Sequence, residues 1–281
     1  MNKFSLFWFT LFAMVAFAAN SLLCRLALKN TQIDPTIFTD IRLLSGIITL
    51  GLINFSKKQL SFTSGNWISA FSLFIYALFF SLAYVSLPTG IGAILLFGSV
   101  QLTMISFGLA KGERFTFLQT IGFILAIIGL GILFFPGLTT PPLKGSMLMI
   151  FSGFSWALYS IKGKNSRSSP LQDTFGNFLR TLPFLILFTI LTLHNQHSDT
   201  LGIIYACLSG AVASGIGYTI WYSVLPQLKS TFAATVQLSV PVIASFAAIF
   251  ILNESLTSRL IFSSLSILLG IAIVITTKKK T

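Results

Sequence analysis

Long apolar runs, separated by short polar breaks, dominate the pattern of residues along this chain. A helix needs roughly 20 mainly apolar residues to cross the hydrocarbon core of a bilayer. Ten runs come close to or exceed this length, and each predicts one membrane-spanning helix. The predicted spans are Phe4–Leu26, Pro35–Phe55, Trp67–Leu87, Gly90–Ala110, Phe115–Phe135, Leu143–Ile161, Leu171–Leu193, Leu201–Val224, Thr231–Leu252 and Ser258–Thr276. The pattern therefore predicts an all-α integral membrane protein.

The second half of the chain repeats features of the first half 141 positions later. The repeated pairs are Glu113 and Glu254, Thr116 and Thr257, and Gly129 and Gly270. The longest break, Pro136–Pro142, falls at the junction. We therefore expect two five-helix units, residues 1–138 and residues 139–281. Repeats of this kind place a substrate site between the halves, near the bilayer midplane.

The positions of Lys and Arg predict the orientation, because cytoplasmic ends of spans carry an excess of both. With the N-terminus in the cytoplasm, twelve basic residues lie at cytoplasmic ends and four lie at the opposite ends. Both termini are therefore expected in the cytoplasm, in a bacterial inner membrane. Since five spans per half is an odd number, the halves are predicted to be inverted repeats.

Composition supports the membrane class and excludes several others. Charged residues make up 9% of the chain and the mean hydropathy is +0.89, whereas soluble domains carry roughly 25% charge. The net charge of +12 does not indicate nucleic acid, because the basic residues lie scattered between apolar runs. Neither the cysteines nor His194-x-x-His197 form a metal motif, and no phosphate-binding loop is present. No cofactor or metal is expected.

Short motifs in the predicted spans carry a family resemblance. The segment Gly112–Thr116 reads Gly-Glu-Arg-Phe-Thr and is followed by Gln119, Gly122 and Gly129. Its second copy, Asn253–Thr257, keeps Glu and Thr but lacks the glycine, and Phe38–Gly46 contains an Arg-x-x-x-Gly stretch. Together they resemble the EamA family of the drug/metabolite transporter superfamily, over essentially the whole chain.

The resemblance implies a secondary transporter. Members of the family export amino acids and related metabolites, so we expect this protein to be an exporter of small metabolites. Relatives in the superfamily move drugs, cations such as choline, or nucleotide sugars, and these remain alternatives. A membrane-embedded enzyme acting on a lipid is a further alternative. That chemistry needs clustered carboxylates with a metal, or an arranged nucleophile, and the six acidic residues are scattered. We expect no enzymatic activity.

Three charged residues lie inside the predicted spans, namely Asp40, Arg42 and Arg180. An ionised side chain at mid-membrane costs roughly 2.5–3.5 kcal/mol on insertion scales, so each needs a reason. Either arginine could bind a substrate carboxylate through its guanidinium fork, or Asp40 could neutralise one of them and join helices. Asp40 is also a candidate for binding and releasing a coupled proton.

Neutral polar residues add further candidates for the substrate site. Amide and indole groups can hydrogen-bond a zwitterion or stack on a flat group without carrying full charge. The deepest of these residues are Asn20, Gln101, Trp156, Asn177 and Gln237. We expect a polar cavity between the halves, lined by the first four spans of each half. The fifth and tenth spans lack deep charges and are expected at the periphery, as packing helices or as a homodimer interface.

Several other residues receive structural interpretations. Glu113 and Glu254 lie at helix starts, where a carboxylate caps the amides of its helix. Tyr222 lies near the end of a span and is expected in an aromatic belt at the membrane surface. Pro183 and Pro241 fall inside spans and predict kinks. The expected partners are a small-molecule substrate and the lipid bilayer.

Overall fold

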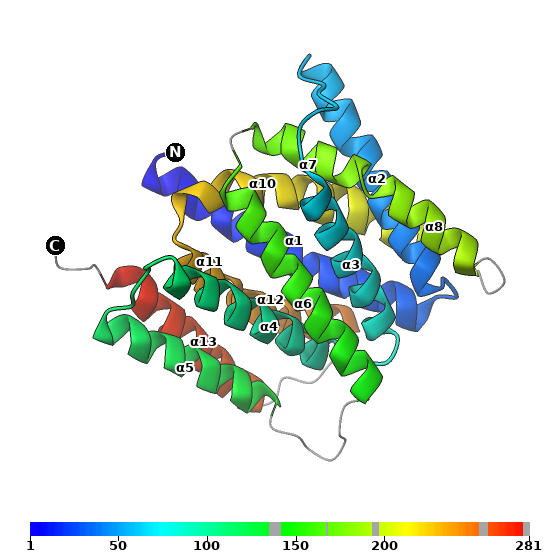
Figure 1. Cartoon of the computed structure of the whole chain (residues 1–281). Coiled ribbons are helices and arrows are strands. Elements are labelled where there is room, and N and C mark those ends of the chain that lie inside the picture. The colour runs from blue at the N-terminus through cyan, green and yellow to red at the C-terminus, as the bar shows by residue number, and fades with distance from the viewer. Residues whose placement is uncertain (135–141, 167, 193–196, 253–257, 278–281) are drawn as a thin grey trace.

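The computed structural model of the chain describes all residues except 135–141, 167, 193–196, 253–257 and 278–281. Every regular element in the described residues is helical (Figure 1). The first half contains α1 (Lys3–Asn30), α2 (Pro35–Ser56), α3 (Trp67–Tyr84), α4 (Thr89–Ala110) and α5 (Phe117–Phe134). The second half contains α6 (Leu143–Lys164), α7 (Pro170–Leu179), α8 (Leu182–Thr192), α9 (Thr200–Leu208), the π-helix η2 (Ser209–Ile216), α10 (Gly217–Val224), the short 3₁₀ helix η3 (Leu225–Gln227), α11 (Ser230–Gln237), α12 (Ser239–Leu252) and α13 (Ser258–Thr276).

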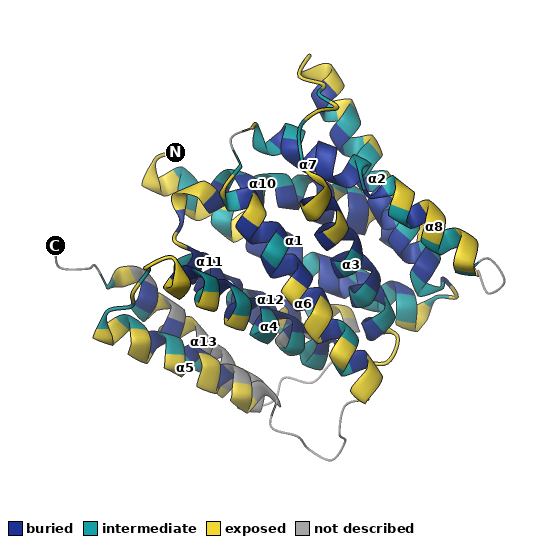
Figure 2. Cartoon of the chain, in the orientation of Figure 1, coloured by how far each residue is buried: buried dark blue, intermediate teal, exposed yellow. Residues whose placement is uncertain are grey.

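Seven helical stretches in the described residues are long and apolar enough to cross a membrane. Four of them are α1 to α4, and the others are Pro170–Thr192, Thr200–Gln227 and Ser230–Ala247. The chain is thus a helical integral membrane protein. Helices α5, α6 and α13 occupy the three remaining predicted ranges, and their membrane crossing stays a prediction. Figure 2 shows exposed residues along α2, α5 and α8, and many of the exposed residues of these helices are large and apolar.

Two prolines explain where two of these stretches break. Proline has no N–H for the carbonyl four residues earlier, and its ring clashes with that carbonyl. Pro183 stands four residues after Leu179, the last residue of α7, and Pro241 stands four residues after Gln237, the last residue of α11. The predicted kinks are therefore full interruptions between two helices.

Glycine allows the π-helix η2 to pack closely against α2. A Cβ atom added to Gly210 would clash with the backbone carbonyl of Arg42 and with the hydroxyl of Ser45. On the facing helix, a Cβ at Gly46 would clash with the ring of Phe178. Small residues at such positions let membrane helices approach closely. This contact brings η2 against the helix that carries Arg42.

Helices α5 and α13 pack against each other at one edge of the bundle (Figure 1). A Cβ at Gly122 would lie 2.8 Å from the carbonyl oxygen of Gly270. The hydroxyl of Ser266 donates a hydrogen bond to the carbonyl of Leu125, at 3.0 Å. Gly122 and Gly270, one glycine from each half, therefore allow the close contact of this helix pair.

Glu113 ties together elements from both halves at one end of the bundle. Its carboxylate accepts hydrogen bonds from the backbone N–H groups of Ser230 and Thr231, at 2.8 and 2.9 Å. It also forms an ion pair with Lys164 at 3.3 Å. Glu113 thus caps the first turn of α11, whereas the sequence analysis expected it to cap its own helix. Burial alone would raise the pKa of Glu113, but these hydrogen bonds and Lys164 outweigh burial and lower that pKa.

Replacing Gly210 by Ala should destabilise the protein by about 1–3 kcal/mol, because the new methyl group meets backbone atoms that cannot move freely. Gly98→Ala in α4 is the matched control, since a Cβ at Gly98 meets nothing within 4 Å. The control should be neutral or stabilising by up to about 1 kcal/mol. Thermal unfolding of both variants in detergent measures the difference. Equal melting temperatures would contradict the close contact of η2 with α2.

Glu113→Gln should lower stability by about 1–2 kcal/mol at neutral pH, because charge-assisted capping bonds are lost. The folded-state pKa of Glu113 lies below its unfolded value. The stabilisation is therefore complete above the unfolded pKa and is lost as the pH falls through the folded pKa. Melting temperatures of wild type and variant should differ by a constant amount at neutral pH and converge below about pH 4. A difference that vanished already at pH 6 would refute the depressed pKa.

Candidate functional site

Arg42 lies at the centre of the bundle and is completely buried. Its Nε donates a hydrogen bond to the hydroxyl of Ser214 at 3.1 Å. Its Nη2 donates to the hydroxyls of Tyr218, at 2.6 Å, and of Tyr76, at 3.3 Å. The guanidinium on α2 is therefore held by neutral hydroxyl groups from α3, η2 and α10.

Asn20 connects the same hydroxyl groups to α1. Its Nδ2 donates to the hydroxyls of Tyr76 and Tyr218, each at 3.2 Å. Its Oδ1 accepts a hydrogen bond from the hydroxyl of Ser209 in η2. Asn20, Arg42, Tyr76, Ser209, Ser214 and Tyr218 form one polar cluster, which we call the Arg42 cluster. It joins the first half of the chain to the second.

The charge of Arg42 has no counter-ion in the described part of the chain. The one ion pair between two described side chains joins Lys164 and Glu113. The rings of Tyr76 and Phe80 each lie 5.2 Å from the guanidinium carbon and give only partial compensation. Atom Nη1 of Arg42 is buried without a hydrogen-bond partner. A buried, unneutralised cation with a free donor is suited to bind an anion.

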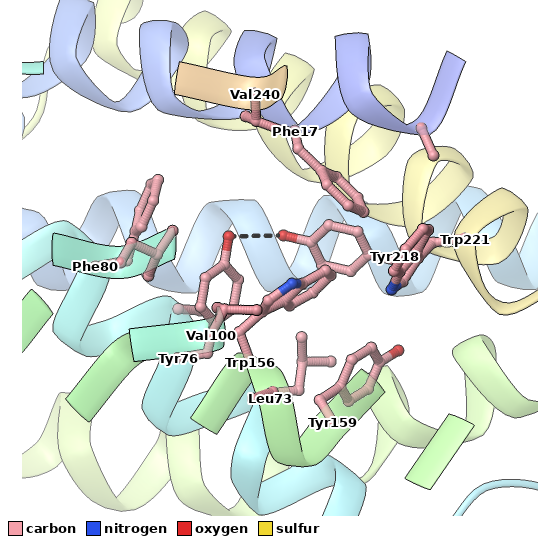
Figure 3. Close-up of a cluster of buried hydrophobic side chains, with 14 of the residues drawn as sticks. Phe17, Leu73, Tyr76, Phe80, Val100, Trp156, Tyr159, Tyr218, Trp221 and Val240 are labelled. Carbon is pink, nitrogen blue, oxygen red and sulfur yellow. Dashed lines mark hydrogen bonds between the residues drawn. The ribbon is translucent and has the colours of Figure 1, made fainter. Parts of the chain in front are cut away.

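A group of packed aromatic rings adjoins the Arg42 cluster (Figure 3). The ring of Trp156 lies 4.7 Å from that of Tyr218, 4.9 Å from that of Tyr76 and 5.0 Å from that of Phe17, measured between ring centroids. We call these four residues the aromatic box. The space beside it, bordered by Ser21, has room for no more than about one water molecule. The structure therefore shows the central region in a closed state.

Gln237 connects the aromatic box to α11, and Gln101 connects α4 to α11. The indole N–H of Trp156 donates to Oε1 of Gln237 at 2.8 Å, and the amide of Gln237 donates to the carbonyl of Ala233 at 3.2 Å. The amide of Gln101 on α4 donates to the carbonyl of Ala234, while its Oε1 is buried without a partner. Gln101 and Trp156 thus each form a hydrogen bond to α11, at Ala234 and at Gln237.

Asp40 lies away from this centre. Its carboxylate accepts a hydrogen bond from the hydroxyl of Thr189 on α8, at 2.7 Å. It borders a shallow groove with the apolar side chains of Leu44 and Ile186. Within the described residues, Asp40 forms no ion pair with Arg42 or Arg180. The structural pairing considered from the sequence is therefore not present.

Arg180 and Asn177 also lie outside the Arg42 cluster. The guanidinium of Arg180 donates to the carbonyls of Phe62, Thr63, Ser64 and Gly176, and so holds the loop between α2 and α3 against the end of α7. The side chain of Asn177 accepts the N–H of Asn66 at 2.9 Å and donates to the hydroxyl of Tyr222 at 3.4 Å. Both residues hold helices and a loop together.

Tyr76 and Tyr218 are central to the cluster, but they were not among the residues predicted from the sequence to form the substrate site. They are 142 positions apart, almost the spacing of the internal repeat, and this was the available signal. The expectation of a membrane-surface belt is wrong for Tyr222, which is 2% exposed and donates to the carbonyl of Tyr159 at 3.0 Å. The prediction used only the position of Tyr222 near the end of a span, which does not reveal that its ring packs against α6.

Comparison with known proteins agrees with the sequence motifs. Residues 143–276 match the model of the EamA-like transporter family. An uncharacterized protein of Pseudomonas aeruginosa is 47% identical over 268 residues, which cover 95% of this chain and 93% of that protein. A probable amino-acid metabolite efflux pump of Escherichia coli K12 is 26% identical over 212 residues, covering 70% of this chain and 71% of the pump.

A solved crystal structure supports the fold independently. It matches with a TM-score of 0.76 at 17% sequence identity, and the match covers 95% of this chain and 96% of the other. At this identity the likeness shows the fold alone. The family match, the near-complete alignment with the Pseudomonas protein and the apolar helices lead to one conclusion. This chain belongs to the EamA-like transporter family and is a membrane transporter.

Proposed function

We propose that the protein is a secondary transporter that exports small metabolites carrying a carboxylate, such as amino acids, across the bacterial inner membrane. The observation that carries this proposal is the buried Arg42, with its free Nη1 and no described counter-ion. The similarity to the E. coli probable amino-acid metabolite efflux pump supports the same substrate class.

Each part of the central region has a role in this proposal. The guanidinium of Arg42 binds the carboxylate, because its fork matches the two oxygens of that group. The side chains of Asn20, Tyr76 and Tyr218 exchange hydrogen bonds with one another for bonds to the substrate. The aromatic faces of Trp156 and Phe17 contact its apolar part. Because the observed centre is closed, substrate binding needs these rings to separate.

Alternating access would follow from two inverted repeats, residues 1–138 and 139–281, with ten spans and both termini in the cytoplasm. The echoed motifs and the distribution of Lys and Arg support this arrangement. The breaks after Leu179 and Gln237 supply hinge positions in the second half. Asp40 is the proposed proton-coupling residue, since it is a half-buried carboxylate inside α2 that accepts a hydrogen bond from the hydroxyl of Thr189.

Arg42→Ala should lower transport by roughly 10–100-fold, because a charge-assisted pair with the substrate contributes about 1.5–3 kcal/mol. Arg42→Lys should restore only part of the activity, since an ammonium cannot make the two-pronged contact. Flux of a panel of amino acids and carboxylate metabolites into proteoliposomes measures the effect, with and without a pH gradient.

Arg180→Ala is the control, as it removes a half-buried arginine of the predicted spans that lies outside the Arg42 cluster. It should lower thermal stability while folded protein keeps its transport rate. Asp40→Asn should remove any dependence of flux on the pH gradient. Wild-type flux in Arg42→Ala would reject the anion site and direct attention to cationic or uncharged substrates.

A topology test addresses the inverted repeats separately. A reporter fused after Thr281 should be cytoplasmic, and a reporter inserted between α8 and α9 should be external, because twelve basic residues lie at the predicted cytoplasmic ends and four at the opposite ends. Alkaline phosphatase and green fluorescent protein fusions distinguish the two sides. Both reporters on one side would refute the ten-span arrangement.

A further inference from the structure

An apolar groove runs between α1 and α11 at the surface of the bundle. Lys3, Phe7, Leu11 and Met14 line it from α1, at spacings of three and four residues that place them on one helix face. Phe232 and Val236 line it from α11. Its volume is about 380 Å³, within the range of pockets that hold small molecules. We call it the α1–α11 groove.

The groove is exposed at one end, and the residues that line its buried end are close in sequence to Phe17 and Gln237. Lys3 and Phe7 are exposed at its mouth, whereas Met14 is 1% exposed at its inner end. Met14 precedes Phe17 of the aromatic box by three residues, which is less than one helical turn. Val236 directly precedes Gln237, whose amide oxygen accepts the indole N–H of Trp156. The inner end of the groove therefore adjoins the aromatic box.

Helix α11 is a short segment with a breakable contact at each end. Its first turn is capped by Glu113, and its last residue, Gln237, is bonded to Trp156. The helix is interrupted immediately after Gln237, because Pro241 cannot donate a hydrogen bond to the carbonyl four residues earlier. Ser239, the first residue of α12, lines the groove. Rotation of α11 about this break would open the groove toward the aromatic box, while α12 stays in place.

The charges along this path indicate which molecule it suits. Lys3 is the charged residue in the lining of the groove, and Arg42 is the unneutralised cation beyond the aromatic box. The lining between them is mainly apolar and aromatic. A molecule that fits both features has a carboxylate and an apolar body. Amphipathic anions of this kind partition into a membrane leaflet, with the apolar body in the hydrocarbon and the charged group at the interface.

We propose that the α1–α11 groove is a membrane-side entrance through which amphipathic carboxylates, with an aliphatic or aryl body, move from the leaflet to Arg42. The inference rests on the proposed transport function and narrows its substrate class to anions that partition into lipid. Lys3 binds the carboxylate at the mouth. Breaking the Trp156–Gln237 hydrogen bond admits the molecule to the aromatic box.

Photolabelling tests the entrance directly, with a decanoate probe that carries a diazirine on its chain. The full-length protein is placed in phosphatidylcholine nanodiscs, irradiated with the probe and mapped by peptide mass spectrometry. Labels are expected on the groove residues Leu11, Met14, Phe232 and Val236, and on Phe17 or Trp156 of the aromatic box. An excess of plain decanoate should remove them. The corresponding diazirine alcohol, which lacks the anion, should label roughly tenfold less.

Two tryptophan variants give a matched comparison on one helix. Leu11→Trp fills the groove and should abolish labelling beyond it, while Phe12→Trp, at an exposed position outside the groove lining, should leave labelling unchanged. Thermal unfolding checks that both variants fold. Lys3→Gln should lower labelling of the groove roughly tenfold, because the anion loses its partner at the mouth.

The outcomes separate the entrance from the transport site. Labelling that plain decanoate does not compete, or that Leu11→Trp does not reduce, would mean that phospholipid chains merely fill the groove, and the entrance would be rejected. Arg42→Ala should retain labels in the groove and lose those on Phe17 and Trp156. Normal flux in Arg42→Ala, together with competed groove labels, would reject the Arg42 site but not the groove as a binding site for amphipathic carboxylates.

Discussion

The organisation of this transporter depends on a guanidinium that is kept charged inside the bundle by neutral groups. Within the described residues, Arg42 forms no ion pair with a carboxylate. Its charge is instead stabilised by the hydroxyls of Ser214, Tyr76 and Tyr218 and by aromatic faces. These partners come from three helical segments, α3, η2 and α10, and Asn20 connects α1 to the same hydroxyl groups. The arrangement therefore sets the positions of α1, α2, α3, η2 and α10 together. An anion that displaced some of these bonds would also loosen contacts between the two halves.

The helices around this centre differ between the halves. Helices α1 to α4 are each continuous, whereas three stretches of the second half are divided at Leu179, at η2 and at Gln237. Proline causes two of these divisions, because it withholds one backbone donor from the preceding turn. The first half therefore provides long, uninterrupted walls, and the second half provides short segments with ends that can rotate. Glu113 holds one such segment, α11, from the side of the first half.

Local pattern predicted much of this architecture, because apolar runs record burial in lipid directly. Helices begin and end close to the expected positions, and Arg42 was selected because a charge inside a span needs a partner. The partners themselves were not predictable in the same way. Arg180 binds carbonyls of a loop more than a hundred positions earlier, and Glu113 caps a helix of the other half. Such contacts depend on how segments meet in space, which hydrophobic periodicity does not encode. The spacing between Tyr76 and Tyr218 is almost that of the internal repeat, but aromatic residues are common in membrane helices, so this spacing alone did not mark Tyr218 as a site residue.

The π-helix η2 has a consequence for the register of side chains around Arg42. In an α-helix, positions five apart are turned about 140° from each other, because each residue advances the helix by about 100°. In a π-helix, bonds run from residue i to i+5, so such positions stack on one face. Ser209 and Ser214 are five apart, and they reach Asn20 and Arg42 respectively. The wider turn therefore lets two serines of one helix face the same centre, and tightening it by a single residue would rotate one hydroxyl toward a neighbouring surface.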